Sequence, residues 1–522
     1  MRFKKDFWLT LMVFIFIAVA LIIIESRPGF PDPDSFYHAK MATVIRDQGL
    51  IKTFPWFQLT DLKNTYVNPH LLYHILLIPF VSLFDPLIGM KISAVIFGLL
   101  AFLAIYLSLR AFKTPCPYLF LLFSALSFGL LHRVSLPRAP ALSIALLLFI
   151  TWAILKKRTW IIFFASIVFV WFYHGWPIVF LSLGATTVGN MISFQLNEQK
   201  NFFKDLFKGF WQEKKNWLAT CGGVIFGLVA NPYFPQNIEF GVLDILKIGV
   251  INYQSVISVG QEWSPKTPTE FLASSVLIFC AFLFSVAFFV PGLLVSKKRP
   301  TQNEMTTALT LVFLAGGYSI LTLKSSRFIE YAVPFLTLAS GFLFVYGLPF
   351  LKKEIWPIFQ NTTKIFFLKL IFVSFALSLI GIIAFKNVTA IAKANDSQTT
   401  DRLKPAVQWI KENVPEKETI FHNAWDHSLI LWYLDDSHYY LVGLDPTFMY
   451  DYDPAAYKLW FDLTNGENTD VKKIIDVFNA KTIFIDTKHG SSSGLIDNLE
   501  TSDLFAKTFD LDGIVVYTAT GL

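Results

Sequence analysis

The sequence predicts a mainly α-helical membrane protein that ends in a separate α/β domain, and two observations carry this prediction. The first is composition: 54% of the 522 residues are hydrophobic, only 16% are charged, and the mean hydropathy is +0.51. A soluble protein has no way to bury that much apolar surface. The second is a change near residue 386, beyond which charges are evenly spread and apolar runs are short. We therefore expect a membrane bundle at residues 1–386 and a soluble domain at residues 387–522.

Apolar runs recur along the first part of the chain, and each is a candidate membrane helix. The run at residues 7–24 is long enough to cross a bilayer, and because no small-residue cleavage site follows it, we expect a retained anchor. The run at residues 71–84 is short and begins with polar residues, so we expect an interfacial or re-entrant helix there. About eleven crossings remain, at residues 7–24, 87–109, 118–131, 139–155, 160–171, 178–194, 217–230, 272–295, 305–323, 331–350 and 365–385.

The connectors between the runs predict the orientation of the chain. If residues 71–84 do not cross, every basic cluster falls on one side of the membrane, which the positive-inside rule makes the cytoplasmic side. The N-terminus is then cytoplasmic, and the C-terminal domain lies outside the plasma membrane. The net charge of +6 thus reflects topology and gives no indication of a nucleic-acid partner. The basic clusters are residues 2–5, 110–113, 156–158, 200–215, 297–299 and 352–353.

The connectors on the outer face differ in kind from these basic turns. They combine acidic, histidine, arginine and tryptophan residues, and the longest is the first outer loop, residues 25–70. Functional side chains gathered on one face indicate a site that opens to the outside. The other outer connectors are residues 132–138, 173–177, 231–235, 261–265 and 324–328.

The first outer loop contains a candidate metal site. Asp32 and Asp34 alternate with two prolines, which fix φ and keep their neighbours out of the helical region, so we expect a stiff, non-helical loop. Hard oxygen ligands on such a loop suit Mg²⁺ or Mn²⁺. His38 and His174 are further candidate ligands on the same face. The alternative is a solvated connector rich in proline, with His174 hydrogen-bonded as part of the structure.

Four more outer residues are candidates for chemistry. A carboxylate at Glu262 is placed to orient or deprotonate an acceptor, although a solvated loop acid is an equally good interpretation. Arg133, Arg138 and Arg327 lie at the ends of membrane segments. The rigid guanidinium fork matches phosphate oxygens, so these arginines are candidates for holding a lipid phosphate. The alternative is that they extend to the lipid headgroups without any further role.

The C-terminal residues alternate between predicted strands and helices, which favours a compact α/β domain. The loop that contains Trp425 and Asp426 directly follows a predicted strand, a position from which side chains are often presented to a ligand. A tryptophan there would otherwise fill the core of the domain. The predicted strands are residues 418–421, 438–442 and 482–485, with a hairpin at 509–519, and the predicted helices are residues 400–413, 453–465 and 471–479.

Together these motifs resemble the GT-C superfamily of membrane glycosyltransferases, and within it the catalytic subunit of archaeal and bacterial oligosaccharyltransferases. The motif around Asp34 is similar to the first-loop motif of that family, in which an aspartate binds the metal. Glu262 is similar to an acceptor-binding glutamate, and Arg327 is similar to an arginine that contacts the donor pyrophosphate. Trp425 and Asp426 fall where the family has a Trp-Trp-Asp motif that recognises the acceptor.

The resemblance implies a function and its partners. A sugar or oligosaccharide would be transferred from a polyprenyl-(pyro)phosphate donor in the membrane to a protein or glycan acceptor. A divalent metal (Mn²⁺ or Mg²⁺) and Arg327 would bind the leaving phosphate. Asp34 or Glu262 would take the acceptor's proton. The chain departs from the family pattern at residues 132–138, which hold no carboxylate, and at Ala424, where the family has tryptophan.

Two alternatives stay open. Transferases of a single sugar from a polyprenyl phosphate, such as protein O-mannosyltransferases and lipid A aminoarabinose transferases, also have an acidic first loop, and the missing second acidic motif favours them. A lipid-linked sugar transporter or a non-catalytic scaffold is the alternative of another class. Transporters usually show internal repeats and ionisable residues within their spans, and the sequence has no obvious repeat.

Overall fold

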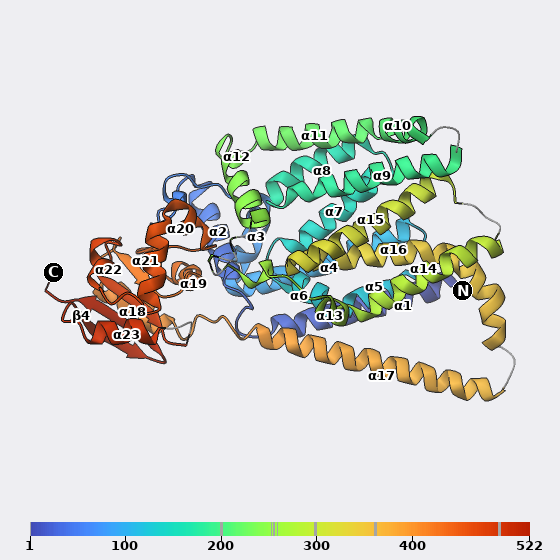
Figure 1. Ribbon diagram of the computed structural model, residues 1–522. Helices are drawn as coiled ribbons and strands as arrows, with labels where there is room; N and C mark the ends of the chain where they lie inside the picture. Colours follow the sequence, from blue (N-terminus) through green and yellow to red (C-terminus); the bar gives the residue numbers. More distant parts are fainter. Residues whose placement is uncertain are drawn as a thin grey trace. The chain divides into compact units, whose positions relative to one another are not determined.

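The computed structural model describes residues 2–198, 202–251, 253, 256–257, 259–296, 300–359, 363–488 and 492–521. The chain divides into two compact units, and each is assembled from three separate segments. The first comprises Met1–Arg27, Lys91–Asn231 and Glu262–Lys393, and the second comprises Pro28–Met90, Pro232–Gln261 and Ala394–Leu522. The first unit consists of long helices and the second contains the sheet (Figure 1).

The first unit is a helical bundle whose elements follow the predicted apolar runs. Each of the eleven runs is largely helical, with the run at 118–131 divided between two helices, and short 3-10 or π turns join several of the helices. The helices are α1 (Arg2–Glu25), α4 (Pro86–Ala111), α5 (Pro117–Ala125), α6 (Phe128–Ser135), α7 (Pro140–Leu155), α8 (Thr159–Phe172), α9 (Val179–Glu198), α10 (Phe202–Gln212), α11 (Lys214–Val229), α13 (Pro268–Ser274), α14 (Val276–Ser296), α15 (Gln302–Lys324), α16 (Ile329–Phe350) and α17 (Thr363–Ala394), with the turns η2 (Trp176–Ile178), η4 (Gln261–Trp263), η5 (Ser326–Phe328), η6 (Leu351–Ile355) and η7 (Trp356–Phe359).

Within the described ranges, seven segments are long and apolar enough to cross a membrane, and α5 with α6 makes an eighth if that pair, bent by 77°, is one span. The chain is thus a multi-pass membrane protein, as its composition predicts. The prediction of about eleven crossings is larger because α7, α8 and α11 have 16, 14 and 16 residues, fewer than the roughly 20 that a bilayer core requires. The seven segments are Asp6–Glu25, Pro86–Ala111, Trp176–Leu196, Val276–Ser296, Gln302–Lys324, Ser326–Ile355 and Val373–Ala394.

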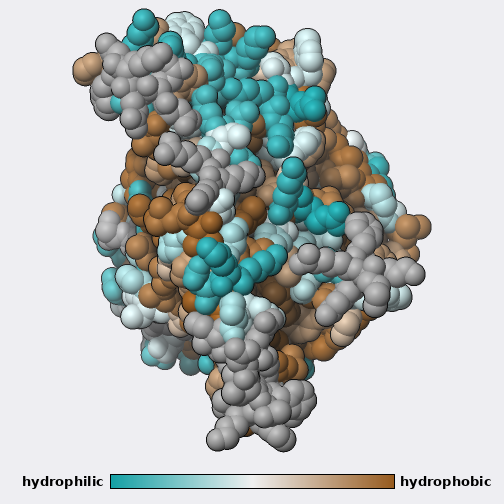
Figure 2. All heavy atoms as spheres, turned by 90° about the vertical axis from the view of Figure 1, so that its right-hand side faces the viewer, coloured by the Kyte–Doolittle hydropathy of each residue, from teal (hydrophilic) through white to brown (hydrophobic). Residues whose placement is uncertain are grey.

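Helix directions separate the two ends of the bundle. The basic turn at residues 156–158 joins α7 to α8, so α7 begins and α8 ends at the opposite end, where residues 132–138 and 173–177 lie. Figure 2 looks at the end that carries the N-terminus and shows hydrophilic side chains gathered across it, with hydrophobic side chains around its sides. The basic cluster at residues 297–299 lies outside the described residues, and so does part of the cluster at 200–215.

The second unit is built around a five-stranded mixed sheet. Its strand order is β2-β1-β3-β5-β4, with β1 parallel to both β2 and β3 and with β5 antiparallel to β3 and β4. The strands are β1 (Thr419–His422), β2 (Tyr439–Tyr440), β3 (Thr482–Asp486), β4 (Phe505–Leu511) and β5 (Ile514–Ala519). The helical elements are α2 (Asp34–Gln48), η1 (Asp61–Lys63), α3 (Leu71–Leu83), α12 (Gln236–Gly241), η3 (Val242–Ile251), α18 (Lys404–Asn413), α19 (His427–Leu434), α20 (Thr447–Tyr452), α21 (Pro454–Thr464), α22 (Lys472–Asp476) and α23 (Ser493–Glu500).

The extent of the second unit differs from the expected domain boundaries. The expected boundary at residue 386 falls inside α17, which continues to Ala394. Most of the first outer loop, expected to belong with the membrane helices, packs in the second unit instead. The reason is its aromatic content: Phe54 and Phe57 are fully buried, and the ring of Phe54 lies 4.7 Å from that of Trp432.

Candidate functional site

One end of the bundle carries a group of charged side chains, here called the arginine cluster: Arg133, Arg138, Glu262, Arg327 and Glu330. Five segments of the chain present them. Arg133 lies in the last turn of α6, Arg138 follows in the turn before α7, Glu262 lies in η4, Arg327 lies in η5 and Glu330 lies in the first turn of α16. The structure therefore brings together all three arginines and the glutamate that the sequence singled out, and it adds Glu330.

Glu262 is the centre of the arginine cluster. Its Oε2 accepts hydrogen bonds from Nη1 of Arg133 at 2.7 Å and from Nη1 of Arg138 at 3.3 Å. Its Oε1 lies 3.8 Å from Nη1 of Arg327. On the other side, Nε of Arg133 donates to Oε2 of Glu330 at 2.7 Å. Glu330 is completely buried and Arg133 is 5% exposed, so these charges are screened little by water.

Arg327 is oriented by aromatic neighbours as well as by charge. Its Nη2 donates to Oη of Tyr173 at 2.7 Å, and its guanidinium lies 4.3 Å from the centre of the Trp263 ring, a cation–π contact. The hydroxyls of Ser325 and Ser326 both donate to the carbonyl of Glu262 at 3.0 Å, which ties η4 to η5. Short turns held in this way fix side chains more tightly than free loops do.

A helix break positions Arg133. Ser127 caps the start of α6, its hydroxyl accepting from the N–H of Leu130, and the chain bends there by 77°. Gly129 then lets α6 approach α16, because a Cβ at this position would lie 2.1 Å from Cδ1 of Ile329. Since Ile329 is two residues beyond Arg327 and next to Glu330, this contact sets the spacing between the two halves of the arginine cluster.

Glu262 is held ionised. Burial alone would raise the pKa of its carboxyl, but the guanidinium groups of Arg138, Arg327 and Arg133 outweigh burial and hold that pKa well below its ordinary value. A carboxylate with so low a pKa is a weak base. The ion pairs make Glu262 the counter-ion of three arginines, and its role as a proton acceptor stays a prediction.

The arginine cluster retains capacity for a ligand. Three guanidinium groups face two carboxylates, which leaves a net positive charge. Nη2 of Arg133 and Oε1 of Glu330 are buried and have no hydrogen-bond partner among the described residues. Buried polar atoms are nearly always paired, so an unpaired donor and an unpaired acceptor on the two members of one ion pair suggest a ligand that carries both kinds of group.

The first outer loop only partly matches the prediction. Asp32 lies in the expected non-helical stretch, but Asp34 is the first residue of α2, with Pro33 as its N-cap at φ −76°. A proline before the first turn is compatible with a helix, and an acidic side chain there is favoured by the helix dipole. Nδ1 of His38 lies 2.7 Å from Nε2 of His74, whose Nδ1 lies 2.9 Å from Oδ1 of Asn68.

The predicted metal ligands are divided between the two units: Asp32, Asp34 and His38 belong to the second unit and His174 to the first. In the part of the chain that the structure describes, no three His, Cys, Asp or Glu side chains gather in a group fit to hold a metal ion. His38 is engaged with His74, and the ring of His174 packs 4.7 Å from that of Tyr173 in the other unit. A requirement for Mn²⁺ or Mg²⁺ stays a prediction.

Trp425 and Asp426 lie in the loop between β1 and α19. Trp425 is half-buried and packs against the core of the second unit, while Asp426 is the N-cap residue of α19. Their predicted contact with an acceptor is untested. Sequence reasoning missed the charged group beside them, in which Arg402 forms a bidentate pair with buried Asp486. The available signal was that Asp486 directly follows the predicted strand at 482–485.

Comparisons with known proteins give the fold. No protein-family model matches the chain, and no curated protein sequence matches it significantly. Among solved structures, the chain is similar to ArnT from Cupriavidus metallidurans bound to undecaprenyl phosphate, with a TM-score of 0.54 and 12% identity over 98% of both chains. It is also similar to the arabinofuranosyltransferase AftD from Mycobacteria, with a TM-score of 0.53 and 11% identity over 97% of this chain.

ArnT and AftD are both GT-C superfamily membrane glycosyltransferases. The chain therefore has the GT-C fold, a polytopic helical bundle with a small sheet-containing domain, and the predicted resemblance is confirmed at this level. The chain spans about 40% of the length of AftD but nearly all of ArnT. At identities this low, the similarity concerns the fold alone.

Proposed function

We propose that this protein is a membrane glycosyltransferase that moves a sugar from a polyprenyl-phosphate donor to an acceptor on the outer face of the membrane. The arginine cluster carries the proposal, because a buried site with net positive charge and rigid guanidinium forks suits a phosphate in a place of low dielectric. The unpaired Nη2 of Arg133 would donate to a phosphate oxygen, and the unpaired Oε1 of Glu330 would accept from a sugar hydroxyl. The undecaprenyl phosphate bound to ArnT supports a polyprenyl donor.

The transfer is a substitution at the anomeric carbon. The acceptor's oxygen or nitrogen forms a bond to that carbon while the carbon–oxygen bond to the phosphate breaks, and the bonding electrons leave with the phosphate. Arg133, Arg138 and Arg327 would stabilise the negative charge that develops there, which is usually the largest catalytic contribution. The acceptor's proton requires a base. Because Glu262 is a weak base, the predicted base is Asp34.

A single-sugar donor is favoured over a lipid-linked oligosaccharide. Residues 132–138 supply arginines where oligosaccharyltransferases have a second acidic motif. Trp425 packs against the domain core, which leaves less of it for recognition of an acceptor sequon. Transfer of an oligosaccharide from a polyprenyl pyrophosphate to protein is the second candidate, favoured by Trp425 and Asp426 following a strand.

The test uses purified protein and two labelled donors, a polyprenyl-phosphate monosaccharide and a polyprenyl-pyrophosphate oligosaccharide. Each is offered with peptide and glycan acceptors, with Mn²⁺ or with EDTA. We expect transfer from the monosaccharide donor, a loss of kcat/KM of about 10²–10³-fold in Arg327→Gln, and a comparable loss in Asp34→Asn. Arg110→Gln is the matched control, since Arg110 is exposed in the last turn of α4.

The outcomes are distinct. Full activity of Arg327→Gln would remove the arginine cluster from the mechanism. Transfer from the oligosaccharide donor alone, dependent on Mn²⁺, would favour the oligosaccharyltransferase interpretation. If the wild-type protein binds donor but transfers nothing, the enzyme proposal fails, and translocation of the lipid-linked sugar in liposomes becomes the next measurement.

A further inference from the structure

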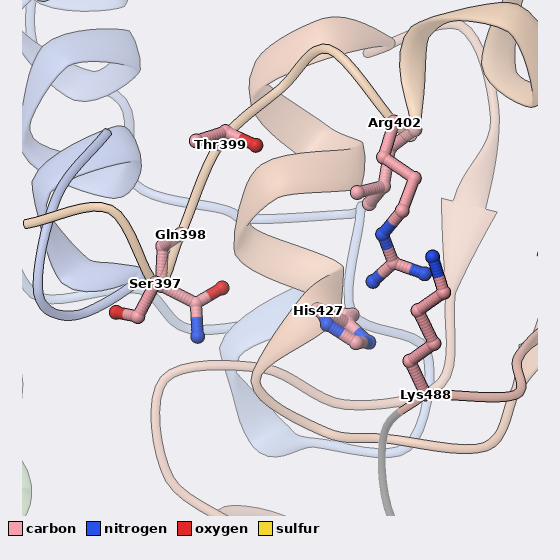
Figure 3. A pocket seen from close by; sticks show the side chains of 7 residues that line it. Ser397, Gln398, Thr399, Arg402, His427 and Lys488 are labelled. Carbon is pink, nitrogen blue, oxygen red and sulfur yellow. The ribbon is translucent and has the colours of Figure 1, made fainter. Parts of the chain in front are cut away.

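The second unit contains a polar pocket with a cavity volume of about 240 Å³, here called the β1–β3 pocket. It is lined by residues 397–399, by Arg402 and Leu403, and by His427 and Lys488. Figure 3 shows the side chains of Arg402 and Lys488 extending toward each other, with the ring of His427 beneath them and residues 397–399 on the facing side. None of the site residues predicted from the sequence lines this pocket.

The topology of the sheet places the β1–β3 pocket where α/β proteins usually bind ligands. Strands β1 and β3 are parallel neighbours, so their carboxyl ends lie at the same edge. The chain leaves β1 for β2 on one side and leaves β3 for the β4–β5 hairpin on the other. Connections that part in this way leave a crevice outside the carboxyl ends of the two strands. His427 lies in the segment that follows β1. Asp486 is the last residue of β3, and Lys488 follows that strand.

Buried Asp486 holds the charged side chains of the β1–β3 pocket in place. It accepts a bidentate pair of hydrogen bonds from Arg402, one of them 2.7 Å from Nη1 to Oδ1, and a further one from the N–H of Lys488 at 2.9 Å. Nε2 of His427 lies 3.5 Å from its Oδ2. Although burial would raise the pKa of Asp486, the hydrogen bonds from Arg402 help to lower it below the ordinary value. Asp486 is thus ionised and holds the fork of Arg402 in place.

One carboxylate does not neutralise this group. Arg402 uses two of its five N–H donors on Asp486 and keeps the others. The ammonium of Lys488 is exposed, and the described residues offer it no acidic partner. Two cations that converge above a single buried carboxylate leave excess positive charge at the mouth of the β1–β3 pocket, which an anion would relieve.

We propose that the β1–β3 pocket binds the anionic group, a phosphate or a carboxylate, of a sugar on the acceptor. Only the assignment to the acceptor rests on the proposed function, since the binding of an anion stands on the pocket itself. The pocket is smaller than the roughly 300–1,000 Å³ of drug-sized sites, which suits one small charged group. Ser397, Gln398 and Thr399 add hydroxyl and amide groups of the kind that hydrogen-bond a sugar.

The experiment measures binding directly and needs no turnover. Full-length protein in a non-ionic detergent is titrated by calorimetry with inorganic phosphate, with glucuronate and with neutral glucose. The titrations are made in the Arg327→Gln background, so that anions bound at the arginine cluster do not mask the β1–β3 pocket. Lys488→Gln removes an exposed charge without disturbing the Arg402–Asp486 pair. Lys481→Gln is the matched control, because Lys481 is an exposed lysine next to the opposite end of β3.

We expect phosphate and glucuronate to bind and glucose not to bind. Lys488→Gln should weaken anion binding about tenfold, or about 1.4 kcal/mol, while Lys481→Gln should bind anions as tightly as its parent. Equal binding by Lys488→Gln and Lys481→Gln, binding of glucose as tightly as glucuronate, or no anion binding at all would each overturn the proposal. Displacement of phosphate by added phosphatidylglycerol would reassign the pocket to a lipid headgroup and overturn the acceptor assignment. Unaltered melting temperatures show that the variants are folded.

Discussion

Glu262 illustrates how neighbouring charges decide what a side chain does. Removing a guanidinium or a carboxylate from water costs several kcal/mol, and a buried charge persists only when partners compensate for it. In the arginine cluster each arginine reaches Glu262, and Arg133 also reaches Glu330. The same three arginines that we propose to hold a donor phosphate also hold the pKa of the Glu262 carboxyl low.

At the residue scale, we predict that Glu262→Gln destabilises the protein by about 3 kcal/mol at neutral pH, because it leaves buried arginines without their counter-ion. A carboxyl with a depressed pKa stabilises the folded state above its unfolded pKa, near 4.5, and this contribution is lost as the pH falls through the folded pKa. The difference from wild type should therefore be largest at pH 7 and shrink below pH 4.5. Thermal unfolding in detergent at several pH values measures it.

Glu239→Gln provides the control for this prediction, since Glu239 is exposed. A difference between wild type and Glu262→Gln that stays constant down to the lowest pH would show that the ionised carboxylate is not what stabilises the arginine cluster.

Individual elements of the bundle depend on close backbone contacts. A Cβ on Gly292 of α14 would lie 1.9 Å from the backbone carbonyl oxygen of Tyr346 in α16, and Gly347 of α16 packs in turn against Phe288. Small residues that let helices approach are a common means of packing in membranes, where burial of apolar surface contributes little. Glu330 lies in the first turn of α16, so the position of this helix in the bundle also determines the geometry of the arginine cluster.

At the element scale, we predict that Gly292→Ala lowers stability by about 1–3 kcal/mol, because a backbone oxygen has no rotamer by which to avoid the added methyl group. Gly316→Ala in α15 is the matched control. A Cβ at Gly316 meets nothing within 4 Å, so alanine there should be neutral or slightly stabilising through helix propensity. Equal melting temperatures for the two variants would contradict the close packing of α14 and α16.

At the scale of the whole molecule, the arrangement of charge predicts orientation. The basic turns and the arginine cluster lie at opposite ends of the helices of the first unit. A site for a polyprenyl donor on the outer face requires the basic end to be cytoplasmic, which agrees with the positive-inside rule. The N-terminus would then be cytoplasmic and the C-terminal domain outside.

We predict that alkaline phosphatase is active when fused after the C-terminal domain and inactive when fused at Lys157, because this enzyme folds only in an oxidising compartment. Fluorescence of a green fluorescent protein fused at the same two points should give the reverse pattern. Phosphatase activity at Lys157 would invert the orientation and move the arginine cluster to the cytoplasmic face.

The sequence by itself determined the class of the protein, since apolar runs of fixed length and basic turns between them are local properties. It also indicated Arg133, Arg138, Glu262 and Arg327, because each lies at the end of an apolar run on one face. The strand–helix alternation of the C-terminal domain was readable for the same reason.

Only the tertiary structure decided how these residues act. Arg133 pairs with Glu262 and Glu330 across 129 and 197 residues of sequence, and no local pattern encodes such a distant contact. Glu330 lies in the first turn of an apolar helix and is recognised as a partner only when Arg133 lies beside it. His38 pairs with His74, 36 residues away in the sequence. The β1–β3 pocket exists only once two strands far apart in sequence lie side by side in parallel.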